Sequence, residues 1–446
     1  MVRPHSPSWK WWVCGTLLLA TMLNYMDRQA LPQTATELKA AYNLTDTRYG
    51  LMEAFFSRAF GIGAILFGTL ADRFGPRRVY PIVLLGWSAA GLLTPFLSWA
   101  SATDAFATVV SGLPTLNLGL LGFTWSPQFF EAPESPGSGP FNWLLACRTM
   151  LGFFEAGHWP CALITVRQIL SAKDRPLGNG ILQSGATVGT VLVIGFVTIV
   201  RYLEASWQIV FYTVGFAGLF WVPLWFSLVR PGDLDGLPPP AADDTASDAP
   251  RGFKLLRMCL TLAIVVSSIA ISWQFLRAWL PKYLVESQGF SRDFRDGAMI
   301  VYNLFADVGS LLSGIIVYRL VARGFGVHKA RVTGFAIFCA VTALTALVPV
   351  VGGGYVGVVL LIIAGAGILG LHPFYYSLVQ ELPRRNMGKI SGCLTACGWM
   401  ATAEVQQGLG SHIDQTRSYD LGFLIVAFSP LVGLAAMLLL WRPGKR

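Results

Sequence analysis

Twelve runs of mostly apolar residues follow one another through this chain, and they limit its fold more than any other feature. A helix needs about 20 such residues to cross the hydrocarbon core of a bilayer. Hydrophobic residues make up 54% of the 446 positions and charged residues 13%, about half the charged share of soluble domains. The runs predict helices at residues 11–31, 49–71, 79–98, 142–169, 178–200, 207–229, 255–284, 295–318, 331–350, 354–381, 388–411 and 420–441.

The length of these runs decides between the two kinds of structure that can cross a membrane. Strands of a membrane barrel are about ten residues long and alternate in polarity. The runs here are longer and apolar throughout. The sequence therefore predicts an all-α membrane protein with twelve transmembrane helices.

The positive charges follow the predicted membrane, which argues against a nucleic-acid partner despite the net charge of +9. Most Lys and Arg residues fall in alternate loops, as Arg73, Arg77 and Arg78 do, while the loop at 101–140 contains neither type. Cytoplasmic loops of membrane proteins hold an excess of positive charge. We therefore expect both termini to lie in the cytoplasm.

The chain divides into two similar halves. A stretch rich in Pro, Ala and Asp follows the sixth predicted helix, and this composition is typical of a flexible linker. Weak internal repetition on either side is common in transporters built from related bundles. We predict an N-terminal six-helix bundle at 1–230, a cytoplasmic linker at 231–253 and a C-terminal six-helix bundle at 254–446.

The first half contains extra residues. Gly68 and Gly314 close the second and eighth predicted helices, whereas Gly178 and Gly388 open the fifth and eleventh at a shorter separation. The surplus must lie between these landmarks, at residues 101–140 on the outer side. Its aromatic, Pro- and Gly-rich composition is compatible with a surface cap, a disordered loop or a short re-entrant segment.

Four charged residues inside predicted helices are the main functional signal: Asp27, Arg28, Arg148 and Glu155. A charge at the centre of a bilayer costs about 2.5–3.5 kcal/mol on insertion scales and persists where it lines a cavity or has a partner. Arg148 and Glu155 are two helical turns apart and so lie on one face. An arginine fork suits a carboxylate substrate, and a nearby buried carboxyl group can exchange protons.

Static ion pairs that hold the first and fourth helices together are the alternative interpretation of these charges, because structural networks also contain buried ionisable groups. The sequence alone leaves this alternative open. A shared aqueous cavity between the helices is the feature that separates the two interpretations.

Two sets of motifs resemble a known family. Residues 68–78 (GTLADRFGPRR) are similar to the signature loop of the major facilitator superfamily, with Pro76 as a departure. Residues 24–28 (NYMDR) and 148–157 (RTMLGFFEAG) resemble its anion:cation symporter branch. That branch includes hexuronate and galactonate proton symporters and the sialic acid and vesicular glutamate carriers. The resemblance implies two pseudo-symmetric six-helix bundles.

The resemblance also implies roles for particular residues. Arg28 and Tyr25 are expected to contact the substrate carboxylate, and Asp27 and Glu155 are expected to take up protons. Arg148 either contacts the substrate or pairs with Glu155. The signature loop implies a cytoplasmic gate between the halves, formed by Gly68, Asp72, Arg73, Gly75 and Arg77.

Three departures from the sugar-acid carriers bear on the expected binding site. Phe60 stands where those carriers have a substrate-binding Tyr, and Ala186 stands where they have a Gln. His372 and Tyr375 occupy positions expected to contact the substrate. We therefore include Phe60, His372 and Tyr375 in the predicted substrate site and expect a reshaped pocket.

Other charges have simpler interpretations. Glu53 and Arg58 either line the outer vestibule or pair with each other. Arg277 is close to the end of its predicted helix, where a long side chain reaches the interface. His158 either relays a proton from Glu155 or orients it by a hydrogen bond. Asp307 and Glu404 are further mid-helix candidates for the cavity.

Together these features predict a secondary transporter that moves a small organic anion, such as a hexuronate or aldonate, with protons by alternating access. A sodium-coupled or exchange carrier and a receptor that no longer transports are the alternatives. No nucleophile or metal motif suggests an enzyme, and no cofactor is expected. We expect a monomer in the bacterial inner membrane, with the anion, protons and lipid as partners and no nucleic acid.

Overall fold

The computed structural model describes residues 6, 8–111, 116–118, 123–125, 130–132, 135–171, 174–234, 252–379, 382 and 387–441. In chain order its elements are α1 (Trp9–Tyr42), α2 (Asp46–Phe74), α3 (Pro76–Leu93), the 3-10 helix η1 (Leu97–Thr103), α4 (Asp104–Ser111), β1 (Leu116–Leu118), β2 (Phe123–Trp125), α5 (Ser138–Glu155), α6 (His158–Ile169), α7 (Arg175–Tyr202), α8 (Gln208–Leu228), α9 (Phe253–Lys282), the π-helical turn η3 (Tyr283–Ser287), α10 (Arg292–Ala322), α11 (Val327–Thr342), the 3-10 helix η4 (Ala343–Leu347), α12 (Gly354–Val379), α13 (Met387–Thr416) and α14 (Asp420–Leu440).

Every predicted apolar run coincides with a helix or a pair of helices in the described residues. The fourth run is interrupted after Glu155, so that α5 and α6 together follow it. Eight described helical segments are long and apolar enough to cross a membrane, two of them formed by α9 with η3 and by α11 with η4. The pair α3 and η1, bent by 111°, adds a ninth if it counts as one span. The helices α1 and α13 have the length, at 34 and 30 residues, but include more polar side chains.

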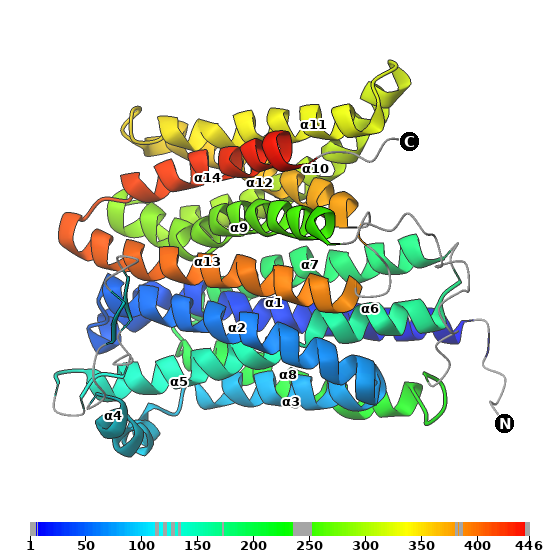
Figure 1. The fold of residues 1–446 in the computed structure, drawn as a ribbon. Coiled ribbons are helices and arrows are strands. Elements are labelled where there is room, and N and C mark those ends of the chain that lie inside the picture. The colour runs from blue at the N-terminus through cyan, green and yellow to red at the C-terminus, as the bar shows by residue number, and fades with distance from the viewer. Residues whose placement is uncertain are drawn as a thin grey trace.

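The helices lie roughly along one common axis, and α1 begins at the same end of the bundle at which α14 ends (Figure 1). One hydrophobic core is formed by α1 to α8, which we call the N-terminal half, and another by α9 to α14, the C-terminal half. The halves meet where α2 lies beside α13 and where α7 lies beside α10. Residues 235–251, most of the predicted linker, lie outside the described residues.

Small residues bring α2 and α5 into close contact. A Cβ atom on Gly152 would come within 2.3 Å of the Phe56 carbonyl oxygen, and one on Gly63 within 2.3 Å of the Phe153 carbonyl oxygen. Such glycines allow helix backbones to approach in membranes. This contact places the buried side chains of α2 directly beside those of α5.

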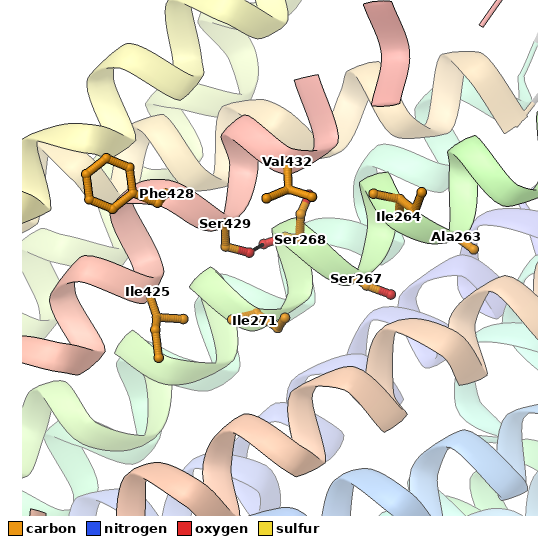
Figure 2. Close-up of a pocket in the computed structure, with 9 residues that line it drawn as sticks. All are labelled: Ala263, Ile264, Ser267, Ser268, Ile271, Ile425, Phe428, Ser429 and Val432. Atoms are coloured by element: carbon orange, nitrogen blue, oxygen red, sulfur yellow. Dashed lines mark hydrogen bonds between the residues drawn. The ribbon is translucent and has the colours of Figure 1, made fainter. Parts of the chain in front are cut away.

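A hollow on the surface lies between α9 and α14 (Figure 2). Ser429 donates a hydrogen bond of 2.8 Å to the Ser268 carbonyl oxygen across this helix pair. The hollow has no charged residue in its lining, which consists of Ala263, Ile264, Ser267, Ser268, Ile271, Ile425, Phe428, Ser429 and Val432. It is therefore separate from the charged residues that the sequence singles out.

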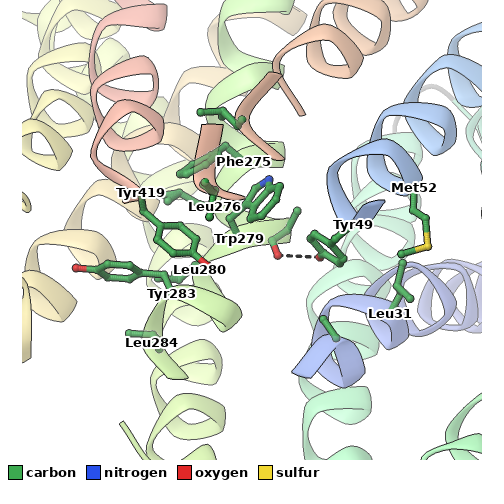
Figure 3. Close-up of a cluster of buried hydrophobic side chains, with 14 of the residues drawn as sticks. Leu31, Tyr49, Met52, Phe275, Leu276, Trp279, Leu280, Tyr283, Leu284 and Tyr419 are labelled. Carbon is green, nitrogen blue, oxygen red and sulfur yellow. Dashed lines mark hydrogen bonds between the residues drawn. The ribbon is translucent and has the colours of Figure 1, made fainter. Parts of the chain in front are cut away.

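A shared hydrophobic cluster joins the two halves at the end of the bundle opposite the start of α1, which we call the far end. Figure 3 shows Tyr49 of α2 pointing at α9, where its hydroxyl donates a 2.9 Å hydrogen bond to the Ala278 carbonyl oxygen. The Tyr49 ring also meets the Trp279 ring edge to face, with centroids 5.0 Å apart. Aromatic contacts of this kind add about 0.5–1.5 kcal/mol beyond the burial of their area.

Ion pairs between the halves surround this cluster. Lys282 of α9 pairs with Asp46 of α2 in a buried position. Asp414 of α13 accepts hydrogen bonds of 2.9 and 2.5 Å from the backbone nitrogens of Asp46 and Thr47, at the first turn of α2. Further pairs between the halves at this end are Lys39 with Glu286 at 2.8 Å, Arg292 with Glu37 at 2.8 Å and Arg201 with Asp293 at 2.7 Å. The far end is therefore closed.

The inserted segment is attached to the N-terminal half. It contains η1, α4 and an antiparallel pairing of β1 with β2. Arg48 of α2 donates to both carboxylate oxygens of Glu131, at 2.9 and 2.5 Å, and Asn142 of α5 exchanges hydrogen bonds with the Glu131 backbone. These contacts attach the described part of the segment to α2 and α5, and the three interpretations of the sequence stay open.

Candidate functional site

Arg28 and Glu155 form a buried ion pair near the middle of the N-terminal half. The Arg28 Nε donates to Glu155 Oε2 at 2.7 Å, and its Nη2 donates to the Asn24 Oδ1 at 3.1 Å. Both members of the pair are at most 4% exposed. The structure thus brings together the two charges that the motifs on the first and fourth predicted helices supplied.

Four aromatic rings surround the Arg28 guanidinium. Its centre lies 4.9 Å from the Tyr25 ring, 5.7 Å from Phe56, 5.1 Å from Phe60 and 5.7 Å from Trp399. The Phe60 and Trp399 rings stack at 4.2 Å. A cation over such rings is held by about 0.5–2 kcal/mol. Tyr25 and Phe60 are therefore beside Arg28, and Trp399 adds a contact from the C-terminal half that the sequence did not suggest.

Arg148 does not pair with Glu155, as one reading of the sequence proposed. It donates to Glu53 Oε1 at 2.7 Å and to the Arg28 carbonyl oxygen at 3.3 Å. Glu53 in turn accepts from Arg277 of α9 through its other oxygen. Glu53 is fully buried, so one carboxylate of α2 bridges an arginine from each half.

Two interpretations of the sequence are corrected by this bridge. Arg277 does not extend to the interface: it is 3% exposed, because its guanidinium pairs with Glu53 of α2 inside the protein. Glu53 does not pair with Arg58. The Arg58 Nη2 instead donates to Glu404 and Gln407 of α13, at 2.8 and 2.7 Å.

The three arginines converge on one side chain, the buried ring of Phe56. The guanidinium centres of Arg28, Arg148 and Arg277 lie 5.7, 4.3 and 5.9 Å from its centroid. Buried nitrogens of Arg148 (Nε and Nη1) and Arg277 (Nη1) have no hydrogen-bond partner among the described residues, nor has the Glu155 Oε1. Donors left in this state are costly unless an acceptor arrives. The arrangement therefore suits an anionic ligand.

Asp27 lies next to Gly91 of α3, whereas the adjacent Arg28 pairs with Glu155 of α5. Neither of its carboxylate oxygens has a hydrogen-bond partner within the described part of the chain, although the residue is only 2% exposed. A Cβ atom on Gly91 of α3 would lie 2.8 Å from the Asp27 Oδ1. Burying an unpaired ionised carboxylate is costly, whereas a neutral carboxyl group is tolerated. This environment favours the protonated form.

The close approach at Gly91 gives a testable prediction. In Gly91→Ala, the new methyl group should displace the Asp27 carboxyl group, because overpacking of a tight site costs about 1–3 kcal/mol. We expect the initial uptake rate in reconstituted vesicles to fall about tenfold, the equivalent of 1.4 kcal/mol. Gly195→Ala is the matched control, since a Cβ atom there meets nothing within 4 Å. Equal uptake by the two variants would contradict the assignment of Asp27.

His158 is held by two hydroxyl groups and not by Glu155. Its Nε2 lies 3.1 Å from the Thr21 Oγ1 and its Nδ1 lies 2.8 Å from the Tyr80 hydroxyl. The side chain is fully buried and ties α6 to α1 and α3. Neither contact involves Glu155, so His158 links three helices of the N-terminal half and neither orients Glu155 by a hydrogen bond nor exchanges a proton with it directly.

The two predicted residues on α12 lie in different surroundings. His372 is partly buried, and its ring is 6.4 Å from the Trp273 ring of α9 and 6.3 Å from Tyr376. Tyr375 is 7% exposed and packs in the hydrophobic core of the C-terminal half. The substrate contacts predicted for His372 and Tyr375 stay predictions. Tyr376, at 56% exposed, is the more accessible neighbour.

The remaining candidates make contacts between the halves. Asp307 of α10 accepts a hydrogen bond from the Thr187 hydroxyl of α7. Glu404 is 58% exposed on its side chain and pairs with Arg58. Neither residue contacts the three arginines directly, so both lie outside the set around Phe56.

The signature loop joins α2 to α3, and Gly75 has a φ of +78°, which a side chain would strain. The Arg77 Nε donates to the Val229 carbonyl oxygen at 3.1 Å, and the Trp225 Nε1 donates to the Arg77 carbonyl oxygen at 3.1 Å. The Arg73 guanidinium lies 5.4 Å from the Phe74 ring. These contacts stay within the N-terminal half, and the gating role predicted for Gly68, Asp72, Arg73, Gly75 and Arg77 stays a prediction.

Several bacterial transporters resemble the chain over nearly its whole length. A D-galactonate transporter of Escherichia coli O6:H1 is 23% identical, with 96% of this chain and 95% of the relative covered. A probable sulfoacetate transporter of Cupriavidus necator is 25% identical, with 95% and 92% covered. A hexuronate transporter of Bacillus subtilis is 23% identical, with 96% and 93% covered.

Solved structures share the fold. The inward open conformation of the xylose transporter XylE from E. coli has a TM-score of 0.67 at 15% identity and covers 98% of this chain and 97% of its own. An inward-facing bacterial homolog of the human lysosomal transporter Spinster has a TM-score of 0.63 at 17% identity, with 98% and 95% covered. The family model of the Major Facilitator Superfamily matches residues 17–403. The chain belongs to the major facilitator superfamily of membrane transporters, and its twelve-helix fold is the one that the sequence predicted.

Proposed function

We propose that this transporter moves a small organic anion together with protons, with Arg28 as the primary anion contact. The observation that carries the proposal is the convergence of three buried arginines on Phe56, with donors of Arg148 and Arg277 unused. Buried charges in membrane helices mark substrate pathways. The similar transporters of galactonate, sulfoacetate and hexuronate support an acid, and we propose a sugar acid or a related small acid as substrate.

Proton coupling would follow from the Arg28–Glu155 pair. While Glu155 is ionised, it occupies the Arg28 Nε and competes with an incoming carboxylate. Protonation of Glu155 removes that competitor and frees the guanidinium for the substrate. Loss of the proton then restores the pair and expels the anion. Asp27, which has no hydrogen-bond partner among the described residues, would hold a second proton.

Alternating access would expose this site to one side at a time. The far end is closed by contacts such as those of Tyr49 with Ala278 and Lys282 with Asp46. The side of the membrane on which α1 begins would be the cytoplasm, as the loop charges predict. Site residues come from α1, α2, α5, α9 and α13 of one chain, so a monomer in the bacterial inner membrane suffices.

Reconstitution into vesicles tests this proposal. With a pH gradient, acid outside, we expect labelled galactonate, galacturonate, galactarate or sulfoacetate to accumulate, and we expect collapse of the gradient by a protonophore to stop accumulation. A difference of about one pH unit supports about tenfold accumulation for each net proton coupled. Accumulation that follows a sodium gradient and ignores pH would exclude proton coupling. Binding of an acid without any flux would indicate a receptor.

A further inference from the structure

We propose that Arg148 and Arg277 form a second anion subsite, with Glu53 as its resident counter-ion, and that the preferred substrate therefore has two anionic groups. This inference rests on the proposed function and extends it to a class of substrate: small dianions such as dicarboxylates or sulfonated carboxylates. Arg28 would bind one anionic group, and the pair Arg148 and Arg277 would bind the other.

The subsite has its arginines already in place. Arg148 comes from α5 and Arg277 from α9, and the two carboxylate oxygens of Glu53 take one hydrogen bond from each. The Arg277 Nε is held by the Gln274 side chain one turn earlier in α9. Both arginines are at most 4% exposed. Their positions are thus fixed by α2 and α9 before any ligand arrives.

Unused donors show where a ligand could bind. The Arg148 Nε and Nη1 and the Arg277 Nη1 are buried and have no partner in the described residues. Guanidinium groups bind carboxylates and other planar or branched anions through two parallel hydrogen bonds. Glu53 uses one nitrogen of each arginine, and a second anionic group would use the others. A static lock between helices would not require donors that are left without acceptors.

The balance of charge favours a dianion. When Glu155 is protonated and Asp27 is neutral, the three arginines around Phe56 are opposed only by Glu53. A monoanion would leave one buried positive charge without a counter-charge, which is costly in low dielectric. A dianion neutralises the set completely. A dianion bound while Glu155 and Asp27 are both protonated therefore makes the loaded site electrically balanced.

The site also spans both halves, which links the second anionic group to the change of conformation. Arg28 and Arg148 belong to the N-terminal half and Arg277 to the C-terminal half. All three surround one ring, so a compact diacid can reach the first arginine and the pair together. In this structure, Glu53 makes the connection to Arg277. The substrate would take over that connection as it binds.

Acids matched in skeleton test the proposal, with affinities measured by isothermal calorimetry on purified full-length protein. The pairs are galactarate against galactonate, glucarate against gluconate, and sulfoacetate against acetate. We expect the wild type to bind the dianion of at least one pair about tenfold or more tightly, because a buried charge pair is involved. In Arg277→Gln, the dianion should lose its advantage and bind no more tightly than the monoanion.

Two further variants separate this role from a structural lock. Glu53→Gln removes the counter-ion of the two arginines, so the monoanion of the tested pair should bind more tightly than it does to the wild type. If the ion pair between Glu53 and Arg277 only holds the helices together, binding should weaken in both Glu53→Gln and Arg277→Gln. Arg58→Gln is the matched control, because Arg58 is also on α2 but pairs with Glu404 outside the site, and its dianion preference should equal that of the wild type.

The outcomes distinguish this inference from the proposed function. Equal affinity of the wild type for both acids of every pair, or a preference that survives Arg277→Gln, overturns the second subsite while anion transport stands. If none of the six acids binds and none is transported, the proposed function and the second subsite both fail.

Discussion

Replacement of Arg28 by alanine is expected to abolish uptake while the protein still inserts into the membrane. The side chain supplies the charge that Glu155 neutralises and that four rings surround. Truncation of one member of a buried charge pair costs about 2–5 kcal/mol, so binding of an acid should weaken about 30-fold or more. Initial uptake rates in vesicles, at matched protein content, give the measurement.

Two companion variants make this result specific. Arg28→Lys keeps the charge but lacks the planar fork, so uptake should be intermediate if two hydrogen bonds to a carboxylate matter. Arg58→Ala removes an arginine from α2 that is paired with Glu404 and Gln407, and uptake should stay near that of the wild type. Normal uptake by Arg28→Ala would remove this residue from the substrate site.

Replacement of Glu155 by glutamine is expected to separate substrate movement from the proton gradient. The amide resembles the protonated carboxyl group, so it leaves Arg28 open to the substrate at every pH and cannot release a proton. Accumulation driven by one pH unit should therefore fall by about tenfold for the coupled proton. Exchange of labelled for unlabelled acid across the same vesicles should continue.

The appropriate comparison is Glu404→Gln, which alters an acid that is 58% exposed on its side chain and lies away from the three arginines. That variant should accumulate substrate as the wild type does. If Glu155→Gln also builds the full gradient, the coupling proton is bound elsewhere, and Asp27 becomes the first residue to examine.

The fold could be predicted from the sequence because each membrane helix corresponds to a continuous run of apolar residues. The break between α5 and α6 was missed for the same reason. Apolar residues continue through Ala156 and Gly157, so composition alone shows a single run. An apolar run thus predicts that the chain crosses the membrane, but it does not predict that the crossing is one uninterrupted helix.

The site was only partly visible in the sequence. Arg148 and Glu155 share a helix face, and both do reach the centre of the N-terminal half, yet each pairs with a residue from another helix. The partners of Glu53 lie 95 and 224 residues away along the chain. No short sequence pattern predicts a pairing between residues so far apart. The sequence instead suggested the nearby Arg58 as a partner of Glu53, which the structure shows paired with Glu404.

Arg277 shows why helix ends mislead. Its place near the end of the helix predicted at 255–284 suggested the interface, but its side chain pairs with Glu53 of α2 inside the protein. On α12, the adjacent residues Tyr375 and Tyr376 are 7% and 56% exposed. Orientation about a helix axis depends on the whole bundle.

The charged residues that join the halves at the far end are suited to the proposed transport cycle, in which the protein populates two conformations. In the proposed alternating access, opening of that end would separate groups such as Lys282 and Asp46 and would expose both to water. Hydration returns much of the free energy that separation removes, since buried pairs give little net stability over solvated ions. The two shapes can thus remain close in free energy, and a single substrate can tip the balance between them.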